Sequence, residues 1–128
     1  MNRWLLTNLV FLIWFVPSKA QQVDSLLKVA DTTRIDTIRF DAWQELGTYY
    51  METDPAKGIR YGNQMLELSR TINDSIRIAF AYQLLGVCYD YKDDLDSCFY
   101  FLRKADSIHI AMNRPDRRAH IISDIALA

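Results

Sequence analysis

An acidic cluster is the first group of side chains in this 128-residue sequence that could do chemistry. Asp90, Asp93, Asp94 and Asp96 lie close enough together to suggest a calcium-binding loop. Such a loop needs glycine at its sixth position for a sharp turn and glutamate at its twelfth as a bidentate ligand. The sequence has neither, so we predict a solvated turn between helices, with an aspartate capping the next helix.

Two histidines and two cysteines are the other candidates for metal or redox chemistry. His109 and His120 are eleven residues apart and have no i, i+4 histidine partner, so we predict no metal site. Cys88 and Cys98 could form a disulfide in an oxidising compartment. On a helix, however, Cys88 would lie about 200° from Gly86 and point away from the following helix, which favours two packed thiols.

The motifs of common enzyme classes do not occur in the sequence. It contains no G-x-S-x-G nucleophile motif, no phosphate-binding glycine loop and no closely spaced cysteine pair. We therefore predict a non-catalytic protein without a cofactor. Aromatic residues could suggest base stacking, but basic residues do not alternate with them, so we assign them to packing: Tyr49, Tyr50, Tyr89, Tyr91, Phe99, Tyr100 and Phe101.

The first twenty residues resemble a secretory signal peptide. Arg3 precedes a mostly apolar run at positions 4–16, and Ser18 and Ala20 are the small residues expected before a cut at Gln21. The run is short for a membrane helix, which needs roughly 20 apolar residues. We predict export, to the periplasm or the outside, with cleavage after Ala20; an uncleaved anchor or a buried apolar helix are the alternatives.

The remaining chain, residues 21–128, is mildly acidic. Arg3 and Lys19 lie in the signal segment, which leaves 13 basic and 16 acidic residues and a net charge of −3. This balance argues against binding nucleic acid or an anionic membrane. Arg114, Arg117 and Arg118 form the densest basic group, and we assign them to a solvated helix start at Pro115.

Apolar residues recur at three- and four-residue steps, which predicts a chain that is almost entirely helical. Asp54, Asp74 and Asp94 stand where helix N-caps belong, and Pro55 and Pro115 suit first turns. The predicted helices span residues 33–51, 55–71, 75–91, 95–112 and 115–128, with a short helix at 23–30. Links of a few residues force neighbouring helices to lie antiparallel.

An internal repeat organises these helices. Aligning Gly47 with Gly86 superimposes WQELGTYY at 43–50 on YQLLGVCY at 82–89, a spacing of 39 residues. A further 40 residues lead to Ile125 and Ala126, with Ile122 at the position of the first aromatic residue. We divide the chain into a signal peptide (1–20), a lead-in (21–32) and a repeat domain (33–128), with repeats at about 33–73, 74–113 and an incomplete 114–128.

The doubled motif resembles the tetratricopeptide repeat (TPR), whose first helix carries W-x2-L-G-x2-Y. The resemblance implies an all-α fold: antiparallel helix-turn-helix pairs stacked as a right-handed solenoid of about two and a half repeats. It implies packing roles for Trp43, Leu46, Gly47, Tyr50, Tyr82, Leu85, Gly86, Tyr89, Cys98, Leu102, Ala105, Ile122, Ile125 and Ala126. In the first repeat the second-helix positions are Gly58, Gly62 and Met65, and the departure at Gly62 predicts looser packing or a terminal variant of the repeat. We attribute the excess over the family's usual period of about 34 residues to longer links.

Members of the TPR family bind peptides or protein segments in a concave groove, which implies a protein or peptide partner here. Helical geometry maps that groove to Gln44, Thr48, Glu52, Phe80, Gln83, Val87, Asp90, Tyr91, His120 and Ser123. His109 is expected on an outer helix. The groove lacks the lysines and asparagines of the family's carboxylate clamp for chaperone tails. A solvated surface without a partner is the alternative.

The last predicted helix has an apolar face, formed by Ile121, Ile122, Ile125 and Leu127, that no following helix covers. The chain could be part of a longer protein, pair with another copy, or fray there. By resemblance to exported bacterial TPR proteins, we predict the amino-terminal sensor portion of a signalling protein such as a sensor histidine kinase. A self-associating periplasmic scaffold is the alternative.

Overall fold

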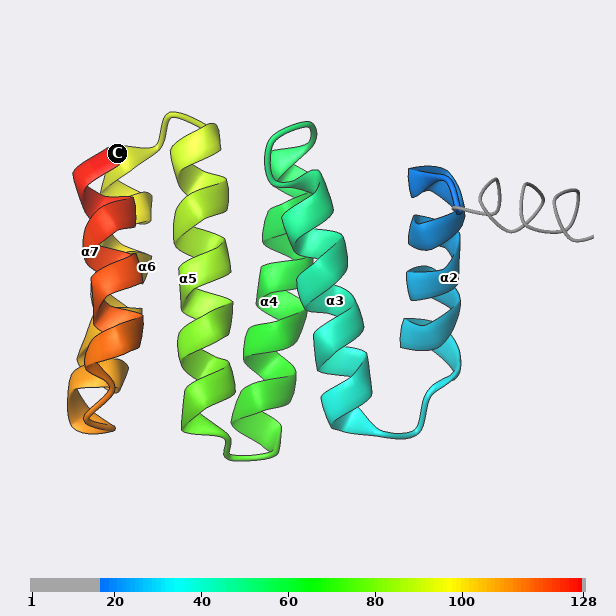
Figure 1. Cartoon of the computed structure of the whole chain (residues 1–128), viewed down its shortest axis with the longest axis horizontal. Coiled ribbons are helices and arrows are strands. Elements are labelled where there is room, and N and C mark those ends of the chain that lie inside the picture. Colours follow the sequence, from blue (N-terminus) through cyan, green and yellow to red (C-terminus); the bar gives the residue numbers. More distant parts are fainter. Residues whose placement is uncertain (1–16, 128) are drawn as a thin grey trace, which may run out of the picture.

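Six helices make up the part of the chain that the structure, a computed structural model, describes: residues 17–127. Figure 1 shows them standing side by side: α2 (Lys19–Thr32), α3 (Asp36–Tyr50), α4 (Pro55–Thr71), α5 (Ser75–Tyr91), α6 (Leu95–Ala111) and α7 (Pro115–Leu127). The all-α prediction is confirmed. The predicted signal peptide lies mostly at positions 1–16, outside the described residues, and no helix within 17–127 is long and apolar enough to cross a membrane.

Aspartate side chains start three of the helices as predicted. The carboxylates of Asp54, Asp74 and Asp94 accept hydrogen bonds from the backbone N–H groups three residues later. Each satisfies a donor that the first helical turn leaves without a partner. This confirms that the acidic cluster forms a helix-capping turn at Asp94. No group of three or more metal-ligating side chains occurs within the described residues.

The turns that end α4, α5 and α6 share one geometry. Asn73, Asp93 and Asn113 adopt left-handed backbone conformations, with φ of 55°, 59° and 52°. The following residue donates its N–H to a carbonyl five positions earlier, as Asp74 does to Ser69 at 2.9 Å. These are Schellman turns, in which asparagine or aspartate replaces the usual glycine.

These turns are short, so the expected long links are wrong. Only residues 72–74, 92–94 and 112–114 separate the helices, whereas α4, α5 and α6 each contain 17 residues. The predicted links included residues that belong to helices: Arg70 and Thr71 end α4, and Pro115 opens α7. The long period therefore arises from long helices.

The corner between α2 and α3 departs from the predicted helix at 33–51. Thr33 and Ile35 are extended, and the Thr33 hydroxyl accepts a hydrogen bond from the Ile35 N–H, so α3 begins only at Asp36. The Arg39 guanidinium donates hydrogen bonds to the carbonyl oxygens of Ala30 and Thr33, so it caps the C-terminal end of α2. The predicted helix at 23–30 is confirmed and is longer, Lys19–Thr32.

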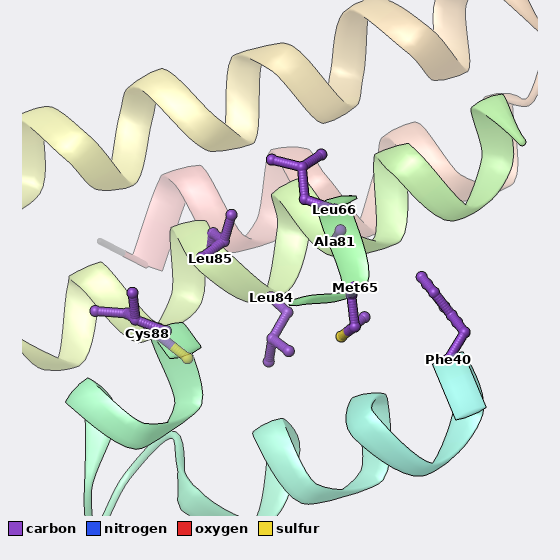
Figure 2. Close-up of a cluster of buried hydrophobic side chains, with 8 residues drawn as sticks. Phe40, Met65, Leu66, Ala81, Leu84, Leu85 and Cys88 are labelled. Atoms are coloured by element: carbon purple, nitrogen blue, oxygen red, sulfur yellow. The ribbon is translucent and has the colours of Figure 1, made fainter. Parts of the chain in front are cut away.

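The main core lies between α3, α4 and α5 (Figure 2). Phe40 of α3 is 1% exposed, whereas Ile38 of the same helix and Ile35, its N-cap residue, are 42% and 56% exposed. Helix α5 is buried on two sides. Ala81, Leu85 and Cys88 share one face and join this cluster. Gly86, about 200° from Cys88 around the helix, faces Leu102 of α6. A second cluster contains Cys98, Leu102, Ala105 and Ile121, and it fastens α7 to α6.

Gly62 gives close packing, so the prediction of a looser first repeat is wrong at this position. A Cβ placed on Gly62 would lie 2.7 Å from Leu85 Cδ2, and one on Gly58 would lie 2.7 Å from Cys88 Sγ. Side chains of α5 therefore fill the space left by the two glycines of α4. The next repeat reverses this arrangement, because there Leu102 of the second helix packs over Gly86 of the first.

Candidate functional site: an inner groove

Three alternate helices together line a hollow of about 290 Å³. Residues at three- and four-residue steps on α3 and α5 point to the same side, and α7 completes that side. The lining residues are Gln44, Thr48, Met51, Phe80, Gln83, Leu84, Val87, Arg117 and His120. Six of these, Gln44, Thr48, Phe80, Gln83, Val87 and His120, were predicted from the sequence to line a groove.

Two further hollows adjoin this central one. Thr48 also lines a hollow of about 460 Å³ between α2 and α3, which includes Glu45 and Glu52. Val87 also lines one of about 190 Å³ among α5, α6 and α7, which includes Asp90, Tyr91 and Asp124. The three hollows follow one another along one surface, which we call the inner groove. Predicted residues Glu52, Asp90 and Tyr91 therefore lie in its flanking parts.

Charge is unevenly distributed along the inner groove. The central hollow contains Arg117 and His120 and no acidic side chain. Both flanking hollows contain carboxylates, and the one between α2 and α3 also contains Lys19. The Arg117 guanidinium lies 5.1 Å from the centre of the Phe80 ring, within the range of a cation–π contact. The centre of the inner groove therefore carries the positive charge of Arg117, whereas its flanks carry most of the carboxylates.

Two hydrogen bonds join helices across the inner groove. The Gln83 amide donates to Asp124 Oδ2 at 3.0 Å, linking α5 to α7. The Tyr91 hydroxyl donates to Glu52 Oε1 at 3.0 Å, linking the end of α5 to the turn after α3. This hydrogen bond to Glu52 raises the pKa of Tyr91. The first bond therefore connects α7 to α5, and the second connects α5 to the turn after α3.

Not every predicted groove residue lies in it, and some lining residues were missed. Ser123 is exposed and lines none of the three hollows. Met51 and Leu84 were missed because they border the packed face, and Arg117 was assigned to a solvated helix start. The contact with the Phe80 ring places Arg117 beside the central hollow, and no sequence pattern predicts that contact.

The packing residues of the two complete repeats are buried or half-buried. Leu46, Gly47, Leu85, Gly86, Cys98, Leu102 and Ala105 are buried, and Trp43, Tyr50, Tyr82 and Tyr89 are half-buried. In the third repeat the assignment fails for Ile122, which is 54% exposed, and for Ala126, also exposed, while Ile125 is half-buried. Ile121 is the fully buried residue there, at the position that Ala42 and Ala81 hold in the earlier repeats.

The two thiols are buried in different clusters, and no disulfide joins them. Burial raises the pKa of Cys88 to about 11, so its thiol is a packed apolar group without nucleophilic character at neutral pH. The pKa of Cys98 is raised as well, mainly by burial. Cys88 Sγ faces Gly58 on α4, the direction expected from the helical angle.

The outer side of α6 carries a separate hollow of about 540 Å³. Only this helix lines it, through Asp96, Phe99, Tyr100, Arg103, Lys104 and Ser107. Tyr100 is exposed there, as are Tyr49 and Tyr91 elsewhere, so packing explains only part of the aromatic set. A surface formed by one helix lacks the converging side chains of the inner groove, which is therefore the better candidate site.

Comparison of the chain with protein-family models, with curated proteins and with solved structures finds no match in any of the three.

Proposed function

We propose that this chain is a non-catalytic interaction module that binds a protein or peptide segment in the inner groove. The observation that carries the proposal is the central hollow, where α3, α5 and α7 bring together side chains 76 positions apart, from Gln44 to His120. Three hollows in succession suit an extended or helical segment better than a compact small molecule.

The chemistry of the central hollow indicates what such a segment would carry. The amides of Gln44 and Gln83 and the hydroxyl of Thr48 can hydrogen-bond to a peptide backbone. Phe80 and Val87 offer apolar contact. The positive charge of Arg117 favours an acidic side chain at the centre of the segment and basic ones toward the acidic flanks.

Peptide selection by phage display on the full chain, followed by affinity measurement, tests this function. Thr48→Arg would block the central hollow, and Ser107→Arg on the outer side of α6 is the matched control, because both place arginine at an exposed helical site. We expect the first to weaken binding of selected peptides by about tenfold or more and the second to leave it unchanged. Equal effects of the two, in variants with unchanged circular dichroism, would place the binding surface elsewhere.

We also propose that the helix pairs are TPRs stacked as a right-handed solenoid. The contact of Leu102 with Gly86, and the stacked pairs Tyr50–Tyr61 and Tyr89–Phe101 at equivalent positions, support a shared repeat unit. A crystal structure tests it: a left-handed stack, or α3, α5 and α7 on different faces, would contradict the proposal.

For location, we propose export by the signal peptide at residues 1–20 and a sensor role within a larger signalling protein. The charged start, apolar run and small residues before Gln21 support export. Ser18 and Gln21 form a capping box at the start of α2, so cleavage after Ala20 would remove the cap and fray the first turn. Amino-terminal sequencing of the exported protein tests the cut, and the downstream gene sequence tests the sensor role through the presence of a kinase domain.

Self-association is the second candidate, favoured by the exposure of Ile122 (54%) and Leu127 (83%) on α7. A scaffold of this kind predicts a concentration-dependent mass by light scattering that Ile122→Glu abolishes. A monomer at all concentrations would exclude it.

A further inference from the structure

His109 is the buried polar side chain that neither the core nor the groove explains. It lies in the last turn of α6 and is 0% exposed. Within the described residues, neither Nδ1 nor Nε2 has a hydrogen-bond partner. Buried polar atoms normally have partners, because losing water without replacement costs free energy. A neutral imidazole tolerates this site far better than a charged one.

The neighbours of His109 make a positive charge there still less favourable. From α5 the contact is the Phe80 ring, 6.3 Å away between centroids. Arg77, one turn earlier on α5, lies over the Phe40 ring of α3 and is paired with Asp74 at 2.7 Å. From the turn and α7 come the two like charges of Arg114 and Arg117.

The carboxylates near His109 already have partners. Asp106, on α6 itself, pairs with Arg118 of α7 at 2.9 Å. Asp116 lies 3.7 Å from the adjacent Arg117. Burial, followed by the charges of Arg114 and Arg117, lowers the pKa of His109 below 6.5.

We propose that His109 makes the docking of α7 depend on pH, so that the neutral imidazole allows α7 to close and the protonated one releases it. Helix α7 is attached mainly through Ile121, which is fully buried, and through the Arg118–Asp106 pair. It also supplies Arg117, His120 and Asp124 to the inner groove. If the proposed function holds, acidification therefore dismantles one wall of the binding site.

The sign follows from proton linkage. When α7 is undocked, water reaches His109 and its pKa lies near the ordinary value of 6.5. When α7 is docked, the pKa of His109 is lower. The undocked state therefore binds more protons below 6.5, and docking weakens as the pH falls through that value toward the docked pKa. Above it, His109 is neutral in both states and docking no longer depends on its protonation.

Amide hydrogen exchange of the full chain, measured by NMR without any ligand, tests this device. After correction for intrinsic rates, protection of α7 relative to α4 should fall about tenfold or more between about pH 7.5 and about pH 5. His109→Leu should abolish that dependence. The matched control His120→Leu, at an exposed histidine of α7, should keep it.

Constant relative protection in the parent protein, or an unchanged pH dependence in His109→Leu, would overturn the proposal. If His109→Leu does not fold, the parent protein still decides, because its imidazole and the Ile121 methyl signals must titrate together below 6.5. Titration of His109 with no change at Ile121 would overturn it equally. Since no peptide is present, these results do not depend on whether the groove binds one.

Discussion

Replacing Gly86 with alanine tests the packing between α5 and α6 at the glycine of the repeat motif. The added Cβ would lie 2.7 Å from Leu102 Cγ, 2.8 Å from Leu102 Cδ2 and 3.2 Å from the backbone oxygen of Cys98. Leu102 is 1% exposed, and a backbone oxygen of α6 cannot rotate away. Overpacking of this kind costs about 1–3 kcal/mol, and the better helix propensity of alanine returns about 1 kcal/mol. We expect a net loss of about 1 kcal/mol, and Gly86→Leu should cost more.

Gly47→Ala is the matched control, because it occupies the same motif position in the other repeat. There the closest atom is Leu84 Cδ2 at 2.5 Å, the end of a flexible side chain, and the next is Tyr61 Cβ at 3.4 Å. Leu84 lines the central hollow and can rotate into it. The clash therefore costs little free energy. Because alanine improves helix propensity by about 1 kcal/mol, the free energy of unfolding of Gly47→Ala should be unchanged or slightly higher.

Urea unfolding followed by circular dichroism gives both free energies, and a double-mutant cycle with Leu102→Ala identifies the cause. Removing the Leu102 side chain should abolish most of the cost of Gly86→Ala. A Gly47→Ala variant that loses as much stability as Gly86→Ala would refute the reasoning, as would a Gly86→Ala cost that persists without the Leu102 side chain.

Three further predictions concern capping, burial and the last helix. Partial burial raises the pKa of Asp74, but hydrogen bonds from Arg77 outweigh this effect and hold the pKa below 3.8. Asp74→Ala should therefore lower the free energy of unfolding, measured in urea, by about 1 kcal/mol near neutral pH. The loss should become smaller as the pH falls below 3.8. Native Cys88 should resist alkylation at about pH 8 and react fully in urea, as mass spectrometry would record; rapid native labelling contradicts its burial. Ile121→Ala should reduce exchange protection of α7 by about 2 kcal/mol or more and Ile122→Ala by much less; the reverse order would mean that α7 packs in another rotation.

Much of the fold could be predicted from local signals. The aspartate caps and Pro55 fix helix starts through hydrogen bonds between near neighbours in sequence, and these starts agree with the structure. The two aligned motifs also gave the buried Leu46 and Leu85. Such features depend on a few adjacent residues and on helical geometry.

What the sequence did not predict depends on contacts between distant residues. Gly62 suggested a gap because the α5 side chain that enters it, Leu85, lies in the next repeat. Arg117 looked solvated because Phe80, its ring partner, lies 37 positions earlier. His109 was correctly expected outside the groove, but its complete burial involves packing against Phe80, 29 positions earlier on α5.

The identical turns at Asn73, Asp93 and Asn113 divide the chain from α4 onward into steps of 20 residues. Successive helices alternate direction, and only every second one, α3, α5 and α7, lines the central hollow. The effect of an insertion or deletion therefore depends on whether it adds or removes an odd or an even number of these helices. Losing one 20-residue step would reverse the direction of every later helix and place outer helices where helices of the central hollow had been. Losing two steps would preserve both the direction of each later helix and the side of the molecule on which it lies. Forty residues is thus the smallest length by which the array could grow or shrink and keep the same kind of helix on the side of the central hollow.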